Sequence, residues 1–249
     1  MRKIVFANQK GGCAKTTTVI NLAAALGELG RKVLIIDLDP QANSTFWVDV
    51  ESNSDCSSEL FRENFDINSI IYQTAMENVS IVPATQKLSE IKTTSKNTKV
   101  DFLYIHKNVR KLKKTWDFVL IDTPPTLGYL TVNALVSAEE LLVPVTTHLL
   151  SLAGVYQLMQ KVNEIQRTAN KDLKILGYLA SRFDTRTRHS KEVLNSLKEN
   201  FGNKVFKTII RENVRLAEAP SFHESILSYA SNSIAASDYR ALAKEIDIN

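Results

Sequence analysis

The chain has 249 residues, of which 44% are hydrophobic and 23% charged, and its formal net charge is +4. This composition supports a full globular core and excludes wholesale disorder, and no stretch approaches the roughly 20 consecutive apolar residues of a membrane-spanning helix. The mild positive charge is compatible with binding a polyanion and does not establish it.

Apolar runs alternate with segments of helical periodicity along the chain. We predict strands over residues 3–8, 32–39, 79–84, 117–125, 140–146 and 174–183, with a short strand near 205–210. We predict helices from the end of a glycine loop to about Leu29, and over 101–114, 130–138, 152–169, 188–200 and 235–246. Residues 85–99 are polar and rich in Lys and Thr, which indicates a surface loop with a short helix.

The predicted strands are near-continuous runs of Val, Ile and Leu, so both faces of the sheet should be buried. Alternation of strands and helices is typical of a parallel sheet with crossover helices. We therefore expect a doubly wound, mostly parallel α/β sheet with helices on both faces, in a single domain over residues 1–249.

A glycine-rich loop lies between the first predicted strand and the first predicted helix. It reads Gln9-Lys10-Gly11-Gly12-Cys13-Ala14-Lys15-Thr16-Thr17. Adjacent glycines let successive backbone N–H groups turn inward around phosphate oxygens, and the helix N-terminus adds its dipole. We expect Lys15 to reach the β- and γ-phosphates, the Thr16 hydroxyl to coordinate Mg²⁺, and Thr17 to bind the α-phosphate. The loop therefore predicts a P-loop NTPase that binds ATP and Mg²⁺.

Carboxylates follow two of the predicted strands: Asp37 and Asp39 after the second, and Asp122 after the fourth. Ligands of open α/β sheets bind beyond the carboxyl ends of the strands, so these acids should face the same crevice as the glycine loop. We expect Asp37 and Asp122 to hold Mg²⁺ together with Thr16, and Asp39 to orient or activate the attacking water. A single aspartate after a strand is often only a cap or a turn former, but three beside a phosphate loop favour a catalytic site.

These segments resemble the deviant Walker ATPases, which include ParA, MinD, the nitrogenase iron protein and the arsenite-pump ATPase. The loop has the KGGxxKTT arrangement of that family, although Gln9 and Ala14 stand where the ordinary Walker pattern has glycine. The segments DLDPQANST, IDTPPTLGYLTVNAL and IRENVRLAEAPS are similar to the ParA/Soj branch, which segregates plasmids and chromosomes. The resemblance covers essentially the whole chain.

The resemblance implies roles for individual residues. It implies that Lys10 crosses a dimer interface to the partner's nucleotide and is catalytic together with Lys15 and Asp39. It implies that Arg211 and Asn213 contact adenine and ribose, although Arg211 stands where the family usually has proline. The ATP-binding residues expected in the loop are Lys10, Gly11, Gly12, Cys13, Ala14, Lys15, Thr16 and Thr17.

Ala14 departs from the usual glycine of the family. If the loop needs a positive φ at this position, alanine costs ~1 kcal/mol or more; if φ is negative, the methyl group is tolerated and stiffens the loop. The sequence leaves both open, and the substitution puts the rate of turnover in question more than nucleotide binding.

Arg186 and Arg215 match arginines that contact DNA in this branch, whose members bind DNA without sequence preference as ATP-bound dimers. Neutralising a few phosphates gives salt-sensitive, sequence-blind binding, and dimerisation doubles the contacts. A second basic segment, residues 107–114, has more the character of one exposed helix face and is the alternative DNA surface. The other cations of the basic stretch 171–215 include Lys171, Lys174, Arg182, Arg188, Lys191, Lys198, Lys204 and Lys207.

Several features argue against other classes of protein. The N-terminus lacks the small-residue cleavage site of a signal peptide, and Cys13 and Cys56 suit a reducing cytoplasm rather than a disulfide framework or an iron–sulfur cluster. The chain starts too close to its first strand for us to expect a helix-turn-helix that reads an operator. Its short, acidic C-terminus does not resemble the basic membrane helix of MinD.

We therefore expect a cytoplasmic, nucleoid-associated partition ATPase. Its ATP-bound homodimer would bind non-specific DNA, and a centromere-binding protein would stimulate its otherwise slow hydrolysis. The same chemistry with a cargo adaptor, positioning carboxysomes or chemoreceptor clusters, is the first alternative. A MinD-like membrane ATPase and a metabolic P-loop enzyme such as a biotin-pathway synthetase are more remote ones.

Overall fold

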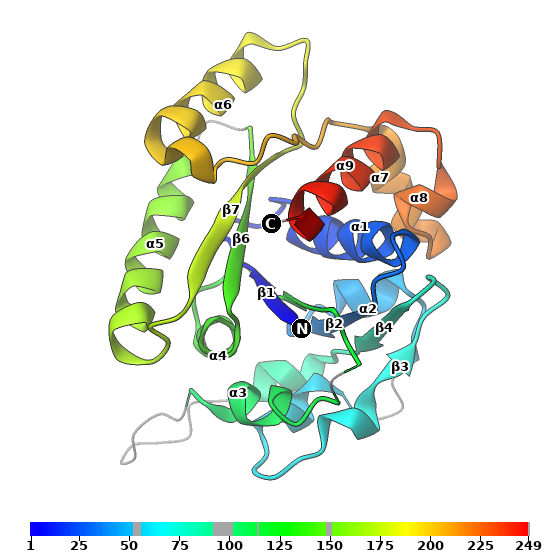
Figure 1. Ribbon diagram of the computed structural model, residues 1–249, viewed down its shortest axis with the longest axis vertical. Helices are drawn as coiled ribbons and strands as arrows, with labels where there is room; N and C mark the ends of the chain where they lie inside the picture. The colour runs from blue at the N-terminus through cyan, green and yellow to red at the C-terminus, as the bar shows by residue number, and fades with distance from the viewer. Residues whose placement is uncertain (52–55, 92–101, 114, 148–150, 249) are drawn as a thin grey trace.

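The computed structural model describes residues 1–51, 56–91, 102–113, 115–147 and 151–248. A seven-stranded sheet in the order β3-β4-β2-β5-β1-β6-β7 forms its centre (Figure 1). Neighbouring strands run parallel, except that the edge strand β3 is antiparallel to β4. The strands are β1 (Arg2–Phe6), β2 (Val33–Asp37), β3 (Tyr72–Gln73), β4 (Val79–Val82), β5 (Phe118–Asp122), β6 (Glu140–Thr146) and β7 (Lys174–Ser181).

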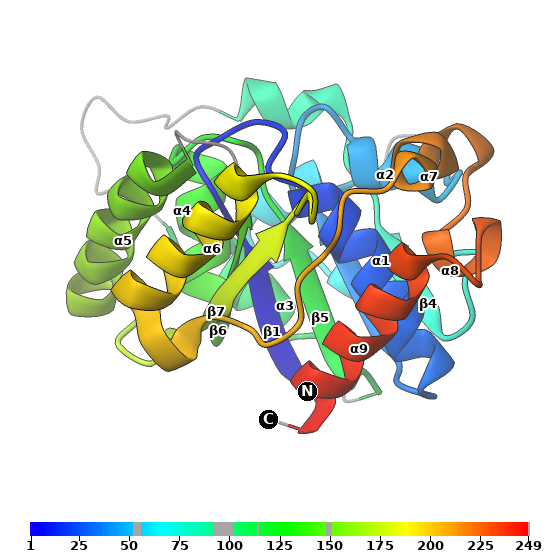
Figure 2. The ribbon, with the colours of Figure 1, turned by 90° about the horizontal axis from the view of Figure 1, so that it is seen from above.

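Helices cover both faces of the sheet (Figures 1 and 2). One face packs against α1 (Lys15–Glu28), α2 (Asn43–Trp47), α7 (Val214–Glu218), α8 (Ile226–Tyr229) and α9 (Ile234–Ile248). The other face packs against α3 (Tyr104–Val109), α4 (Tyr129–Ser137), α5 (Ser151–Thr168) and α6 (Arg188–Phe201). Short 3₁₀ helices connect them: η1 (Ser57–Phe61), η2 (Ile67–Ile70), η3 (Gln86–Glu90), η4 (Gly202–Lys204) and η5 (Ala219–Phe222).

Side chains alternate between the two faces of the sheet along each strand, and this divides the hydrophobic core into two layers. In β2, Leu34 and Ile36 join the layer under α3 to α6, while Val33 and Ile35 join the layer under α1 and α9. Successive side chains of a strand point to opposite faces, so a strand that is buried on both faces reads as an unbroken apolar run. The prediction of a doubly wound, mostly parallel sheet is confirmed.

The strand predicted near 205–210 is wrong, because this segment makes an isolated bridge between Val205 and Tyr178 and no continuous ladder; its backbone donates to β7 from Phe206 and Ile210 alone among the described hydrogen bonds. The backbone N–H groups of Lys207 and Thr208 instead donate to the carboxylate of Glu245 on α9, at 2.8 and 2.9 Å. A side chain from a distant helix thus takes up the hydrogen bonds that a strand ladder would have used.

The helix predicted over 101–114 is shorter than expected. Helix α3 ends at Val109, and the next turns tighten, with the N–H of Lys111 donating to Asn108 O at 3.0 Å. Residues 101 and 114 lie outside the described part. The surface loop expected over 85–99 holds η3, and residues 92–99 lie outside the described part. None of the described helices is long and apolar enough to cross a membrane.

Candidate active site

The glycine loop joins the end of β1 to the start of α1 and lines a cleft beyond the carboxyl ends of the strands. The cleft has a volume of about 440 Å³, within the range of roughly 300–1,000 Å³ that is usual for small-ligand pockets. Gly12 and Ala14 have left-handed backbones, with φ of 70° and 65°. Of the two conformations considered for Ala14, positive and negative φ, the structure has the positive one. The methyl group of Ala14 therefore strains the backbone of the loop.

Lys15 is buried beneath this loop, with only 7% of its surface exposed. Its Nζ lies 3.4 Å from Asn8 O, 3.5 Å from Lys10 O and 3.8 Å from Cys13 Sγ. Within the described residues it has no carboxylate at ion-pair distance. A buried ammonium group that meets only carbonyl oxygens and a thiol is incompletely compensated, so the position favours an anionic ligand.

The carboxylates that follow β2 and β5 lie beside the loop. Asp122 Oδ2 accepts hydrogen bonds from Thr16 Oγ1 at 2.7 Å and from Ser44 Oγ at 2.8 Å. Asp37 Oδ2 accepts from the N–H and hydroxyl of Thr45, and its Oδ1 accepts from the N–H of Asp39. The carboxylate of Asp37 therefore holds the segment 38–45 in place, while Asp39 lines the cleft.

Burial raises the pKa of both inner carboxyl groups. Loss of solvation, and then the charge of Asp122, raise the pKa of Asp37 to about 7. Loss of solvation raises the pKa of Asp122 to about 6, against the hydrogen bonds from Thr16 and Ser44 and the nearby charge of Lys15. Two neighbouring buried acids that resist ionisation favour a cation between or beside them.

The residues present fit a magnesium ion. Asp122 Oδ1 is buried and has no hydrogen-bond partner among the described residues, while the Thr16 hydroxyl lies at the other oxygen of the same carboxylate. The described residues contain no group of three or more His, Cys, Asp or Glu that would hold a metal alone. Magnesium needs few protein ligands where phosphate oxygens and water supply the others.

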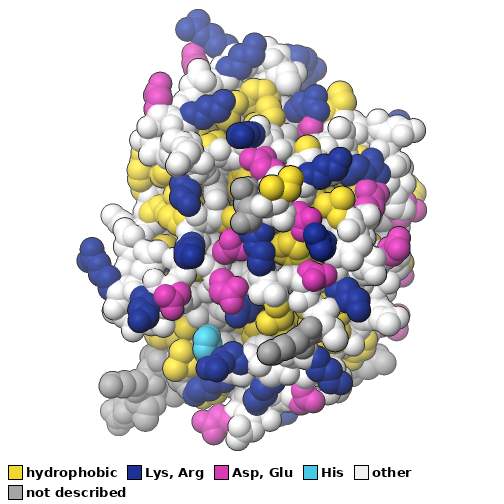
Figure 3. All heavy atoms as spheres, in the orientation of Figure 1, with side chains coloured by type: hydrophobic (Ala, Val, Ile, Leu, Met, Phe, Trp, Pro, Cys, Tyr) yellow, Lys and Arg dark blue, Asp and Glu magenta, His cyan; other side chains and the backbone are white. Residues whose placement is uncertain are grey.

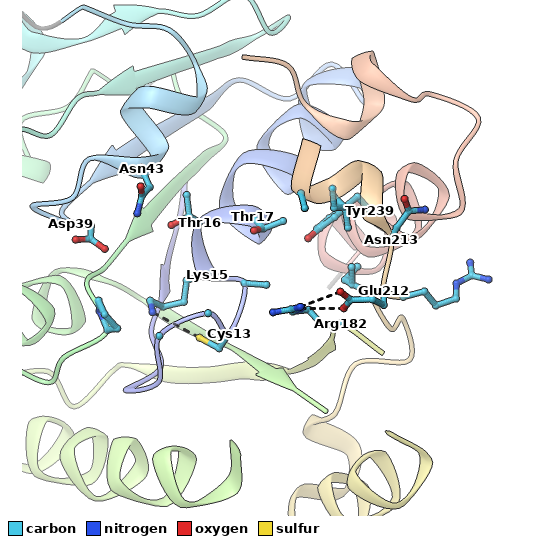
Figure 4. A pocket seen from close by; sticks show the side chains of 18 of the residues that line it. Cys13, Lys15, Thr16, Thr17, Asp39, Asn43, Arg182, Glu212, Asn213 and Tyr239 are labelled. Carbon is cyan, nitrogen blue, oxygen red and sulfur yellow. Dashed lines mark hydrogen bonds and ion pairs between the residues drawn. The ribbon is translucent and has the colours of Figure 1, made fainter. Parts of the chain in front are cut away.

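The far end of the cleft is built by segments distant in the sequence (Figure 4). The Arg182 guanidinium donates to both carboxylate oxygens of Glu212 at 3.1 Å. Arg211 pairs through its guanidinium and its N–H with Asp238 of α9. Asn213 Oδ1 accepts from the N–H of Arg215 and so caps α7. The structure thus places Arg211 and Asn213 in the cleft wall, with Arg211 already held by a carboxylate.

Comparisons with known proteins agree with this geometry. Residues 1–175 match a family model described as an AAA domain. The chain is 37% identical to the sporulation initiation inhibitor protein Soj of Bacillus subtilis, over 99% of this chain and 98% of that protein. It is 38% identical to the chromosome-partitioning ATPase Soj of Treponema pallidum, over 98% and 96% of the two chains. The chain belongs to the ParA/Soj family of P-loop ATPases.

Solved structures share the fold. Cobyrinic acid a,c-diamide synthase of Mycobacterium smegmatis, with bound ATP analog and magnesium, matches with a TM-score of 0.86 at 31% identity, over 98% of this chain and 93% of that one. Apo McdA of Cyanothece matches with a TM-score of 0.87 at 23% identity, over 99% of each chain, which shows the fold alone. The family resemblance drawn from the sequence is confirmed.

The two arginines that the family resemblance predicts to contact DNA lie on the surface. Arg186 is 85% exposed in its side chain and pairs with Asp184 at 2.9 Å, whose pKa the hydrogen bonds from Arg186 lower to about 2. Arg215 is exposed on α7. Neither lines the nucleotide cleft, so their role in binding DNA stays a prediction.

Sequence reasoning missed several residues of this ParA/Soj site. Ser44 and Thr45 lie in the DLDPQANST segment. The only indication of their role in the sequence was that two adjacent hydroxyl residues follow the two aspartates closely. Asp238 and Tyr239 on α9 carried no signal, because only folding brings Asp238 to Arg211 and Tyr239 to the wall of the cleft. The side chain of Tyr239 is fully buried.

Proposed function

We propose that this protein is a partition ATPase whose ATP-bound dimer binds DNA without sequence preference and is released when a partner stimulates hydrolysis. One observation carries the nucleotide part: a buried Lys15 without an acidic partner lies in a glycine loop beside Asp122, which has a buried, unpaired oxygen. Relatives named chromosome-partitioning ATPases support the assignment to DNA partition.

We assign a task to each group that lines the cleft. The amides of residues 10–17 surround the phosphates, and Lys15 neutralises the β- and γ-phosphates. Thr16 and Asp122 hold Mg²⁺, which neutralises the charge that develops on the transferred phosphoryl group. Asp37 was expected to hold Mg²⁺ as well, but both of its oxygens already hold residues 39 and 45, so we propose that it supports the Mg²⁺ ligands from the next layer of residues. Asp39 orients the water that attacks.

Lys10 is the candidate for a contact across the dimer. It lies on the partly exposed outer turn of the loop, and its N–H donates to Asn8 Oδ1 at 3.2 Å. The backbone of the loop is held by this bond, while no described group holds the Lys10 ammonium. A lysine on the outer turn is therefore available to a nucleotide bound by a second copy of the chain.

Arg186 and Arg215 are the candidate DNA contacts. The pair between Arg186 and Asp184 lies on the surface, where solvent weakens ion pairs, so a phosphate can replace the carboxylate at small cost. Two arginines on each protomer give four on a dimer, which makes affinity for DNA depend on dimerisation. This would place the protein on the nucleoid in the cytoplasm, where a centromere-binding protein is the stimulating partner.

Retention on DNA-coated beads with ATP, with ADP and without nucleotide tests the proposal. We expect strong retention of the unaltered protein with ATP alone, and prolonged retention of Asp39→Ala, which binds ATP but cannot activate water. Equal retention in all three conditions would show that DNA binding does not depend on the bound nucleotide, against the proposal. Normal turnover of Asp39→Ala would remove its assigned role.

The likeness to a diamide synthase at 31% identity favours a second candidate, a metabolic enzyme of the same fold. Such an enzyme would hydrolyse ATP only with a small carboxylated substrate and would ignore DNA. A protein-positioning ATPase would bind DNA but respond to a cargo adaptor in place of a centromere-binding protein. Measuring ATP turnover with DNA, with each partner and with small carboxylates separates the three.

A further inference from the structure

A second cleft, here called the α3 cleft, lies between residues 62–64 and helix α3 and shares no lining residue with the nucleotide cleft. It has a volume of about 520 Å³. Figure 3 shows Lys and Arg side chains gathered over α3 on this face of the molecule. Its charged and titratable lining residues are Arg62, Glu63, His106, Lys107, Arg110 and Lys111.

The spacing of apolar residues forces these cations outward. Ile105, Val109 and Leu112 are buried in the core layer between the helices and the sheet, four and three residues apart. Residues at this spacing share one face of a helix, so Lys107 and Arg110 must lie on the opposite, exposed face.

Hydrogen bonds from Asn108 and Lys111 hold the walls of the α3 cleft together. The amide of Asn108, which is 1% exposed, donates to Leu60 O at 2.7 Å and to Arg62 O at 3.2 Å. Lys111 Nζ donates to Phe65 O at 3.0 Å and to Asn108 Oδ1 at 3.1 Å. The walls are therefore fixed before any ligand arrives, which lowers the cost of ordering on binding.

The positive charge of the α3 cleft is only partly neutralised. Four permanent cations line it against a single carboxylate. Arg62 pairs with Glu59, but the Arg110 guanidinium has no hydrogen bond or ion pair with any described residue. Burial, followed by the charges of Arg110 and Lys3, lowers the pKa of His106, as expected in a positive field. Such a site attracts anions.

We propose that the α3 cleft is a second DNA site, which takes the phosphodiester backbone of a duplex independently of Arg186 and Arg215. Lys113, exposed beyond the rim, extends the positive surface past the cleft, which suits an elongated anion better than a compact one. Cations that contact the phosphates of DNA, and not the edges of the bases, bind DNA without sequence preference, as the proposed function requires. The inference rests on that function, because it assumes that the protein binds DNA.

Charge reversal tests the site. Lys107→Glu with Arg110→Glu should weaken binding to a short duplex, in the presence of ATP, by at least about tenfold. It should also lower the slope of log affinity against log salt by about 2 per protomer, one for each lost phosphate contact. The matched control is Arg167→Glu with Lys244→Glu, which makes the same charge change on exposed positions of α5 and α9 and should leave the slope unchanged.

Three outcomes are decisive. If the unaltered protein binds no duplex with ATP, the proposed function fails and this site fails with it. If only Arg186→Glu with Arg215→Glu weakens binding, the α3 cleft is not a DNA site while the proposed function stands. If the α3 variant and the control weaken binding equally, the effect is net charge alone and the proposal is overturned.

A second measurement does not depend on the folding of Lys107→Glu with Arg110→Glu. In Arg186→Glu with Arg215→Glu, the His106 resonance should still shift when duplex DNA is added, because Arg110 beside it binds a phosphate. Inorganic pyrophosphate serves as the small-anion probe. A shift with pyrophosphate and none with duplex would identify a free oligophosphate as the ligand and overturn the proposal.

Discussion

The two ends of the nucleotide cleft are built in different ways. At the phosphate end, one short loop supplies the amides and Lys15, and two strand ends supply carboxylates that are already in register, Asp37 beside Asp122. At the far end, the wall combines the end of β7, the loop 210–213 and helix α9, joined by the ion pairs of Arg182 with Glu212 and of Arg211 with Asp238.

The difference separates two kinds of specificity. Phosphate recognition depends on backbone groups and a single lysine, so a local motif is enough to create it. The far wall depends on side chains that meet only after the C-terminal helix packs against α1. We expect substitutions at the phosphate end to abolish nucleotide binding, and substitutions at the far end to weaken it together with the stability of the fold.

The largest effect is expected at the phosphate end. Lys15→Ala removes the buried cation beneath the glycine loop and should weaken ATP binding at least about 100-fold, since a desolvated charge contact contributes several kcal/mol. Because the ammonium group lacks an acidic partner in the protein alone, the unliganded variant should not lose stability. Calorimetric titration and thermal unfolding measure the two quantities, and tight binding by the variant would contradict the assignment.

The raised pKa values at this end predict a dependence on pH. Because folding raises the pKa of Asp37 to about 7 and of Asp122 to about 6, the folded state binds more protons than the unfolded state above pH ~4. Their stabilising contribution is complete below that pH and is lost as pH rises through ~6 and ~7.

The measurement is thermal unfolding without metal, for the unaltered protein and Asp122→Asn, between pH 5 and 7.5. The variant should gain stability relative to the unaltered protein as pH rises. Binding of Mg²⁺ with nucleotide should release protons in the same range, detectable in buffers of different ionisation enthalpy. A constant difference in melting temperature would show that the pair ionises freely.

The far end is tested by Asp238→Ala. This change leaves the half-buried Arg211 guanidinium and its N–H without their acceptor, so the free energy of unfolding should fall by about 2–3 kcal/mol. Affinity for ATP should fall about tenfold, because the loop 210–213 loses its anchor. Urea unfolding and nucleotide titration measure these changes.

The neighbouring residue provides the control. Tyr239 is fully buried beside Asp238, and Tyr239→Phe keeps the ring and leaves the ion pair intact, so it should change the free energy of unfolding by no more than about 1 kcal/mol. If Tyr239→Phe destabilised the protein as much as Asp238→Ala, packing of α9 rather than the ion pair would account for the far wall.

The smallest effect on stability among these predictions is expected in the glycine loop, at Ala14. Ala14→Gly relieves a left-handed backbone at φ 65° and should raise the free energy of unfolding by about 1 kcal/mol. It also restores the residue usual in the family at this position. A decrease in stability would show that the extra freedom of glycine in the unfolded chain outweighs the relief of strain.

Local sequence patterns predicted much of the fold, and they predicted which residues line one end of the cleft, the glycine loop and the acidic strand ends. The sheet strands were found because burial on both faces leaves an unbroken apolar run, and their boundaries shifted by a few residues at most. The strand near 205–210 failed because Glu245, some 40 residues later, captures two N–H groups of that segment. Helix α2 and strand β3 were missed, since five and two residues are too short for periodicity.

By itself, the sequence determined the glycine loop between β1 and α1, the acidic strand ends and the family, because each is a contiguous motif whose chemistry is local. Only the tertiary structure decided the left-handed φ of Ala14, the partner of Arg211, the burial that raises the pKa values of Asp37 and Asp122, and the α3 cleft. Those properties depend on which distant groups come into contact and on how much water they exclude. The spacing of residues along the chain predicts neither the contacts nor the burial.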